Sequence, residues 1–124
     1  MREIKTELVP KAIGPYSQAI VVGDFLYTSG QIPVDPKTGL IAPDIASQAN
    51  QAFSNLTNLI KESGFENIIK TTVFIKNMDD FACINEIYAK YFSEPYPARS
   101  CVEVSRLPKD VLLEIEAVAY KGKK

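Results

Sequence analysis

The sequence predicts an α+β domain in which one mixed β-sheet carries two helices on one face. Segments with the alternating apolar pattern of strands lie near both ends of the chain and once in its middle, and two segments with helical spacing separate them. The resulting order, β-β-α-β-α-β-β, fits a single sheet covered by two helices. With 124 residues, 46% of them hydrophobic and 23% charged, we expect one domain spanning residues 1–124.

The first three elements follow one another in the N-terminal half. Residues 19–30 have the pattern of two short strands joined by a Gly-Asp turn. A loop with three prolines comes next, and apolar residues then recur at helical spacing. We expect a helix over about residues 44–63, with Asp44 as its N-cap and Gly64 as its C-terminal stop.

The C-terminal half contributes a strand, a helix and two closing strands. Alternation over residues 68–76 predicts a half-buried strand. Four of its residues, Ile69, Thr71, Val73 and Ile75, are expected to share one face. The second helix, over residues 81–92, is predicted to start after one of two consecutive aspartates, Asp79 or Asp80, and to end before a segment with two prolines.

The closing strands carry charged residues inside otherwise apolar segments. In the first of them Arg99 and Cys101 alternate with small and apolar residues, and in the second an unbroken apolar face alternates with a face that bears Glu114. If the two strands are neighbours, all three side chains share the sheet face away from the helices. Because Phe74 and Val118 point toward the same face, we expect an oligomer interface whose clefts hold the charges.

Each candidate residue also has a plainer interpretation. Arg99 can form a structural ion pair with a glutamate across the strands, and Cys101 can be a small buried hydrophobic residue. Ser29 and Gly30 stand at a strand end, where they suit a turn, and Tyr16 can be a core aromatic residue with a satisfied hydroxyl. Spacing alone leaves these alternatives open.

The composition excludes several classes of chemistry. Histidine is absent, which removes Ser-His-Asp and Cys-His nucleophiles and every histidine-containing metal site. The formal charge of −1, from 14 basic and 15 acidic residues, provides no basic footprint for nucleic acid or an anionic membrane. No apolar run resembles a signal peptide or a membrane span, and the two cysteines show no metal-binding spacing. We therefore expect a cytoplasmic protein with reduced thiols.

Four stretches, in order along the chain, resemble one family. They are AIGPYSQAI at 12–20, YTSGQIPVDPKTG at 27–39, KTTVFIKNMDDFACINEIYAKYF at 70–92 and PARSCVEVSRLPKDVLLEIEAVA at 97–119. Together they resemble the Rid (reactive intermediate deaminase) family, formerly YjgF, and specifically its RidA subgroup, over essentially the whole chain. The resemblance implies a chorismate-mutase-like α+β fold that assembles as a homotrimer, with a central barrel-like sheet core and clefts between subunits.

The resemblance also implies an activity and a site. RidA proteins hydrolyse 2-imino acids, formed from enamines such as 2-aminoacrylate and 2-aminocrotonate, to 2-keto acids and ammonia. They use no metal or cofactor, and they protect pyridoxal-phosphate enzymes from these enamines. Carried over by position, Arg99 holds the substrate carboxylate and Glu114 orients or activates the attacking water. The other positions of the implied substrate-binding cleft are Tyr16, Ser29, Gly30 and Cys101, with Phe81 and Asn85 at its edge.

A different class of function is the alternative. Members of the family that the chain resembles are also connected with RNA cleavage, translation inhibition, regulator binding and chaperone-like behaviour. RNA binding calls for a basic surface with exposed aromatic residues, which the scattered lysines and arginines do not favour. A non-catalytic role in binding a partner or a small molecule stays open, and function retained without Arg99 would favour it.

Overall fold

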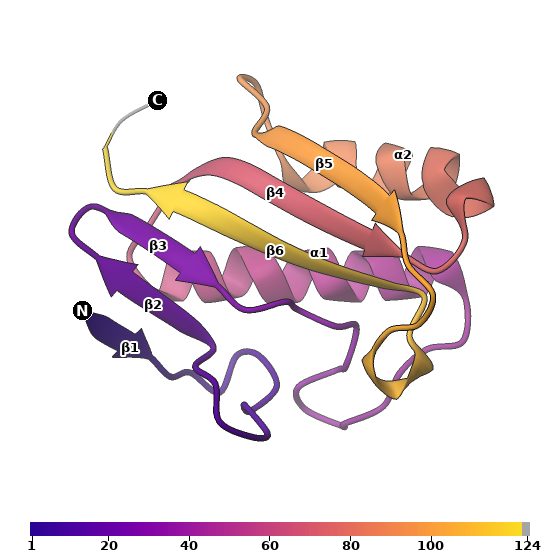
Figure 1. Ribbon diagram of the computed structural model, residues 1–124, viewed down its shortest axis with the longest axis horizontal. Coiled ribbons are helices and arrows are strands. Elements are labelled where there is room, and N and C mark those ends of the chain that lie inside the picture. Colours follow the sequence, from indigo (N-terminus) through magenta and orange to yellow (C-terminus); the bar gives the residue numbers. More distant parts are fainter. Residues whose placement is uncertain (123–124) are drawn as a thin grey trace.

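The computed structural model describes residues 1–122 and shows two helices covering one face of a six-stranded sheet (Figure 1). The elements are β1 (Arg2–Ile4), β2 (Ala19–Val22), β3 (Phe25–Thr28), α1 (Ile45–Glu62), β4 (Asn67–Ile75), α2 (Phe81–Tyr91), β5 (Ala98–Glu103) and β6 (Leu113–Tyr120). The strand order is β1-β2-β3-β6-β4-β5, with β4 and β5 parallel and the other neighbouring strands antiparallel. The α+β prediction is confirmed. Strand β1 was not predicted, because three residues are too few to show alternation.

Helix α1 lies where the apolar spacing predicted it. The carboxylate of Asp44 accepts a hydrogen bond from the backbone N–H of Ser47 at 2.9 Å, which caps the N-terminus. At the other end Gly64 adopts a φ of +86°, a left-handed conformation that glycine takes without steric cost. The apolar side of the helix buries Phe53 and Leu56 completely. Both predicted ends of this helix are therefore confirmed.

Helix α2 starts after Asp80, one of the two predicted positions, but Asp80 makes no side-chain capping bond. The side chain of Asn77 instead caps the single 3₁₀ turn before the helix. Against α1, the rings of Tyr88 and Phe92 stack at 4.1 Å and Phe53 meets both of them edge-on. Neither α1 nor α2 has the length and apolarity needed to cross a membrane. The aromatic contacts hold α2 beside α1, and α2 lies at the β5 side of the sheet (Figure 1).

Strand β4 departs from the predicted alternation at one point. Thr71 and Val73 are buried under the helices as expected, but Ile69 is 42% exposed. The pairing of β4 with β6 shifts register between Ile68 and Lys70. An irregularity of this kind moves a side chain to the other face, and Ile68 packs against the core in place of Ile69. The predicted face of Ile69 was therefore wrong.

The prediction that Arg99, Cys101 and Glu114 share one sheet face is also wrong. Strand β4 separates β5 from β6, and its helix-facing residue Thr71 is the direct cross-strand partner of Arg99. Arg99 and Cys101 therefore lie on the helix side of the sheet. Glu114 is the partner of Phe74 on the opposite face. Both faces of β5 mix polar and small apolar residues, so hydrophobicity alone does not identify its inner face.

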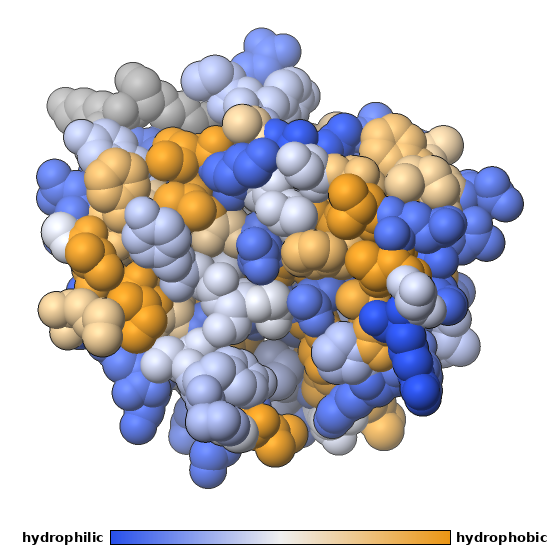
Figure 2. Space-filling view, viewed as in Figure 1, coloured by the Kyte–Doolittle hydropathy of each residue, from blue (hydrophilic) through white to orange (hydrophobic). Residues whose placement is uncertain are grey.

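The sheet face away from the helices is partly apolar, as predicted. Phe25, Tyr27 and Val102 are 38%, 50% and 43% exposed. Figure 2, in the same view as Figure 1, shows apolar residues gathered over the β2–β3 side of this face. Exposed apolar side chains in such number are typical of a surface that contacts another subunit.

Candidate active site

The predicted site residues form two clusters on opposite sides of the sheet. The arginine cluster lies where β5 meets α2 and consists of Phe81, Asn85, Arg99 and Cys101. The glutamate cluster lies where the end of β3 meets the start of β6 and consists of Tyr16, Ser29, Gly30 and Glu114. A single chain therefore brings the predicted residues together in two groups and not in one.

In the arginine cluster, helix α2 holds the guanidinium of Arg99. Nη1 donates a hydrogen bond of 2.7 Å to Oδ1 of Asn85. The Arg99 Cζ lies 4.8 Å from the ring centroid of Tyr88 and 5.4 Å from that of Phe81. The three α2 residues are four and three positions apart, so they share one face of the helix. Two aromatic rings and a neutral amide fix the guanidinium without neutralising its charge.

The guanidinium borders an open pocket. The pocket has a volume of about 410 Å³ and is lined by Asn85, Tyr88, Ala89, Tyr96, Pro97 and Arg99. Burial raises the pKa of the Cys101 thiol, although the charge of Arg99 acts in the opposite direction. A thiol with a raised pKa stays protonated near neutral pH and is a poor nucleophile. The pocket is thus suited to binding an anion and not to covalent catalysis by Cys101.

In the glutamate cluster, the Glu114 side chain lies directly against the backbone of Gly30. A Cβ on Gly30 would stand 2.2 Å from Glu114 Oε2 and 2.6 Å from its Cδ, so only glycine leaves room for the carboxylate. Burial first, and the neighbouring Glu116 second, raise the pKa of Glu114. The ion pairs of residues 1–122 do not include Glu114. A carboxylate with a raised pKa and without a counter-charge is well suited to take up a proton.

The other two members of the glutamate cluster line the same cavity, which has a volume of about 490 Å³. The hydroxyl of Ser29 donates to the carbonyl of Ser17 at 2.5 Å, which fixes the end of β3. The hydroxyl of Tyr16 accepts from the N–H of Ile13 at 3.3 Å, and Tyr16 is 51% exposed. The interpretation of Tyr16 as a core aromatic residue is therefore wrong, while the strand-end interpretation of Ser29 is compatible with its position in the cavity wall.

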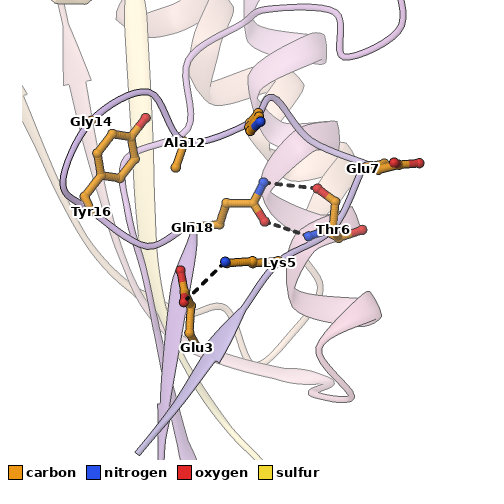
Figure 3. A pocket seen from close by; sticks show the side chains of 9 residues that line it. Glu3, Lys5, Thr6, Glu7, Ala12, Gly14, Tyr16 and Gln18 are labelled. Atoms are coloured by element: carbon orange, nitrogen blue, oxygen red, sulfur yellow. Dashed lines mark hydrogen bonds and ion pairs between the residues drawn. The ribbon is translucent and has the colours of Figure 1, made fainter.

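Tyr16 also borders a second pocket, formed by the N-terminal segment. Figure 3 shows this pocket, which has a volume of about 520 Å³. The side-chain amide of Gln18 binds both backbone groups of Thr6, accepting at 2.8 Å and donating at 3.1 Å, and donates also to the carbonyl of Pro10. Gln18 thereby ties residues 6–10 to the start of β2 and closes the segment in which Tyr16 lies.

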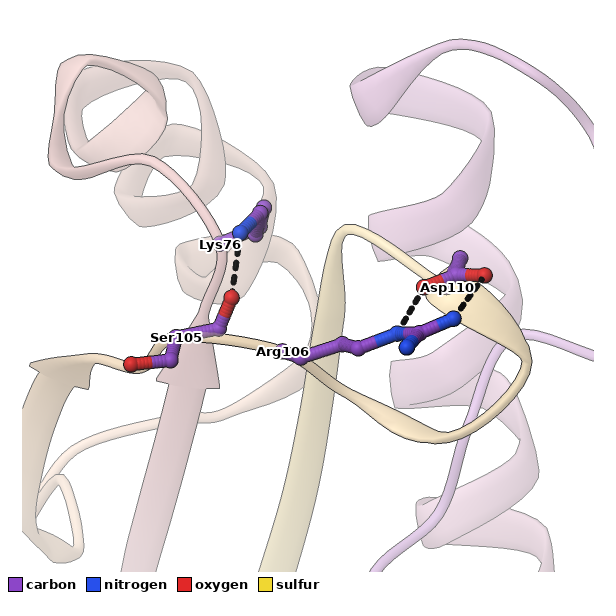
Figure 4. A network of polar contacts seen from close by, with 4 residues as sticks. All are labelled: Lys76, Ser105, Arg106 and Asp110. Carbon is purple, nitrogen blue, oxygen red and sulfur yellow. Dashed lines mark hydrogen bonds and ion pairs between the residues drawn. The ribbon is translucent and has the colours of Figure 1, made fainter.

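The loop between β5 and β6 also lines the Glu114 cavity, and sequence reasoning did not identify it. Its residues Lys109 and Asp110 both adopt left-handed backbone conformations, with φ of 56° and 54°. Arg106 spans them with two hydrogen bonds to the Asp110 carboxylate, of 2.6 and 3.1 Å, and Lys76 donates to the carbonyl of Ser105 (Figure 4). The sequence signal that could have indicated this loop was the pair of opposite charges four residues apart, with a proline between them. Such charge pairs are common on protein surfaces.

The alternative that Arg99 serves a structural ion pair is not supported. The salt bridges of residues 1–122 are Lys5–Glu3 and Arg106–Asp110. In the same part of the chain, no group of three or more His, Cys, Asp or Glu side chains is arranged to hold a metal. Arg99 and Glu114 therefore stand on opposite faces, each bordering its own pocket and each without an ion-pair partner in the described residues.

Comparison with known proteins identifies the family. The family described as endoribonuclease L-PSP matches residues 6–121. A RutC family protein of Pyrococcus horikoshii is 56% identical over 121 residues, which cover 95% of this chain and 96% of that protein. A 2-iminobutanoate/2-iminopropanoate deaminase of Escherichia coli strain K12 is 50% identical over 125 residues, covering 97% and 98%. The crystal structure of E. coli TdcF with bound serine has a TM-score of 0.94 at 48% identity, covering 98% of this chain and 100% of that one. The chain therefore belongs to the endoribonuclease L-PSP family, the Rid (YjgF) family that its sequence resembled.

Proposed function

We propose that this protein is a 2-iminobutanoate/2-iminopropanoate deaminase, a hydrolase that converts 2-imino acids to 2-keto acids and ammonia. The observation that carries the proposal is the charged guanidinium of Arg99, fixed beside an open pocket by neutral partners. Proteins with this activity in their names, from E. coli and Salmonella typhimurium, are 50% identical to the chain. The serine bound to the similar TdcF has a carboxylate next to a C2 that carries nitrogen, an arrangement that the proposed substrates share.

A homotrimer would supply what one chain lacks. Arg99 and Glu114 lie on opposite faces of the sheet, so they can act on one small molecule only if two subunits contribute. Strand β5, with Arg99, is the edge strand at one end of the sheet. We infer that this edge approaches the glutamate cluster of the next subunit and that the partly apolar sheet faces form the barrel-like core.

The chemistry needs a bound carboxylate, a placed water and a proton carrier. Arg99 binds the carboxylate of the 2-imino acid through parallel N–H groups. The ionised Glu114 of the adjoining subunit accepts a proton from water as the water oxygen bonds to C2, and then transfers that proton to the nitrogen. This gives a carbinolamine; the carboxylate next takes the remaining proton from its hydroxyl and delivers it to the nitrogen, the C2–N bond breaks, ammonia leaves and C2 keeps the oxygen as a carbonyl. One imino acid and one water thus give one keto acid and one ammonia.

Four further residues are proposed to contact the substrate. Tyr16, Ser29 and Gly30 line the cavity of Glu114 and are proposed to contact the substrate. Cys101, with its raised pKa, is proposed to pack against the substrate as a thiol. The cytoplasmic location remains a prediction; Cys83 and Cys101, both free, are compatible with it.

RNA cleavage is a second candidate because the family description names an endoribonuclease. The net charge of −1 argues against it, since RNA binding draws most of its affinity from neutralising phosphates. A non-catalytic partner-binding role would use the same open pockets. The activity of an Arg99 variant separates the deaminase from both alternatives.

The test measures the lifetime of 2-aminoacrylate, generated from serine by a dehydratase, while keto-acid and ammonia release are followed. Arg99→Ala is the test variant, and Arg2→Ala, which removes an exposed arginine of β1, is the matched control. We expect wild type and Arg2→Ala to accelerate release and Arg99→Ala to lose at least about 100-fold in kcat/KM, since a charge-assisted bidentate contact is lost. Equal rates for all three proteins would contradict the proposal.

A further inference from the structure

We propose that Tyr88 is a positioning residue for Arg99, whose guanidinium it orients so that the substrate carboxylate binds to the Nε and Nη2 edge. The inference rests on the proposed function for the identity of the ligand, but its structural part concerns Arg99 alone. Tyr88 was not among the residues that the sequence or the resemblance indicated. It is 4% exposed and lies directly beneath the guanidinium, at 4.8 Å from Cζ.

The hydroxyl of Tyr88 is anchored to strand β4. It forms a 2.8 Å hydrogen bond with Oγ1 of Thr71, and both side chains are buried. Thr71 is also the direct cross-strand partner of Arg99 in the β4–β5 ladder. The backbone of Arg99 and the ring beneath its side chain are therefore both fixed relative to the same residue of β4.

Two phenylalanine rings support the ring of Tyr88. Phe92 stacks on Tyr88 with an interplanar angle of 25°, and Phe53 meets Tyr88 at 90° with centroids 5.6 Å apart. Both phenylalanines are buried. Because close-packed rings in a core allow little reorientation, the face of Tyr88 that Arg99 contacts is held at a fixed angle.

One edge of the Arg99 guanidinium keeps its hydrogen-bond donors available for a ligand. A guanidinium has five N–H groups in one plane, and the Nε–H and Nη2–H groups are parallel along one edge. Asn85 accepts a hydrogen bond from Nη1, the nitrogen away from that edge. The ring centroid of Phe81 lies 5.4 Å from Cζ of Arg99. Asn85 and Phe81 thus act through Arg99, and the Nε and Nη2 edge stays available for a carboxylate.

The test compares two variants at position 88 with a control on the same helix. Tyr88→Phe keeps the ring and removes the bond to Thr71, whereas Tyr88→Leu removes the ring. Tyr91→Leu is the control because Tyr91 packs on Phe53 and its hydroxyl bonds to Asn50, with no contact to Arg99 given by the structure. Four quantities are measured in the assembled protein: KM and kcat for the imino acid, the affinity for 2-ketobutanoate by calorimetry, and the NMR shift of the Arg99 Nε–H.

We expect Tyr88→Leu to raise KM and weaken 2-ketobutanoate binding by about tenfold with kcat within about twofold of wild type, because the carboxylate contact is the same in the ground and transition states. The Arg99 Nε–H resonance should lose its ring-current shift. Tyr88→Phe should keep both the shift and an affinity within about twofold of wild type, because Phe53 and Phe92 still hold the ring without the hydroxyl bond, and Tyr91→Leu should do the same. A general loss of stability would not reproduce this pattern, since Tyr88→Phe also loses a buried hydrogen bond.

Two results would overturn the inference: an unchanged affinity and resonance in folded Tyr88→Leu, or equal losses in Tyr88→Phe and Tyr88→Leu. If Tyr88→Leu does not fold, Tyr88→Met takes its place, because methionine fills irregular gaps in a core without a ring, and an unchanged Arg99 resonance there would equally contradict the positioning role. Absence of turnover in the wild type would refute the proposed deaminase and not the inference, because the resonance and the keto-acid affinity are measured without turnover.

Discussion

Replacing Gly30 by alanine tests how closely the catalytic proposal depends on the position of one carboxylate. The new Cβ would stand 2.2 Å from Glu114 Oε2, whereas ordinary van der Waals contact begins at 3.4 Å. The carboxylate must therefore move by about 1 Å, and a displacement of that size at a reacting group costs on the order of 100-fold in rate. We expect Gly30→Ala to lower kcat by about that factor.

The same substitution should change stability little. The φ of Gly30 lies outside the left-handed region, so alanine can adopt the backbone conformation, and the atoms it meets belong to a side chain that can move. Gly23→Ala is the matched control, because Gly23 has a φ of +57° and nothing within 4 Å of the added Cβ. That variant should lose about 1 to 2 kcal/mol of unfolding free energy and keep its activity.

The assay is steady-state release of keto acid and ammonia, together with urea denaturation of the three proteins. A crystal structure of Gly30→Ala would show whether Glu114 has moved. Wild-type kcat in Gly30→Ala, in a protein whose Glu114→Gln variant is inactive, would refute the reasoning that links the position of the carboxylate to the rate.

Three further predictions follow from the charged groups. Glu114→Gln should melt at a higher temperature than wild type at about pH 7, because the raised pKa of Glu114 means that its ionised form opposes folding. The difference in melting temperature should vanish below the pKa of unfolded glutamate, where the carboxyl group is protonated in both states. Equal melting temperatures of the two proteins at both pH values would contradict this prediction. Glu116→Gln should shift the acid limb of the kcat/KM profile to lower pH, because the neighbouring charge raises the pKa of Glu114, and an unmoved limb would exclude that coupling. Arg106→Gln should leave the midpoint of urea denaturation nearly unchanged despite the two bonds to Asp110, because the pair is exposed. A clear drop in the midpoint would show that the pair holds the loop.

Features that depend on neighbouring residues along the chain could be predicted from the sequence. The limits of α1 follow from the capping carboxylate of Asp44 and the conformational freedom of Gly64, and both were read correctly. The apolar inner face of β6 was evident because each inward position from 111 to 119 is apolar, and each is buried.

Features that depend on contacts between distant segments could not be predicted. The side of the sheet on which Arg99 lies is set by its pairing with Thr71, which is 28 residues earlier in the chain. The pattern of apolar residues in β5 does not reveal that pairing. The irregularity in β4 moves Ile69 outward without any change in residue type. Tyr88 occupies an apolar stripe of its helix, and its bond to Thr71 has no local sequence signal.

The resemblance to a family supplied what the local patterns lacked. The strand pattern had drawn attention to Arg99 and Glu114, and the resemblance gave them the roles of binding the carboxylate and activating the water. It also implied sites between subunits, an arrangement that the separation of these two side chains on opposite sheet faces makes necessary for a joint role. The shared site between subunits is accordingly the central claim to be tested.

Mixing two inactive variants tests that claim most directly. Arg99→Ala subunits keep Glu114, and Glu114→Gln subunits keep Arg99, so a site shared between neighbours is complete wherever the two kinds meet in the correct order. Random reassembly of equal amounts should restore about a quarter of the wild-type activity, since each site draws its two halves independently in a cyclic oligomer. No activity in mixed oligomers, with wild type surviving the same reassembly, would contradict a site shared between subunits.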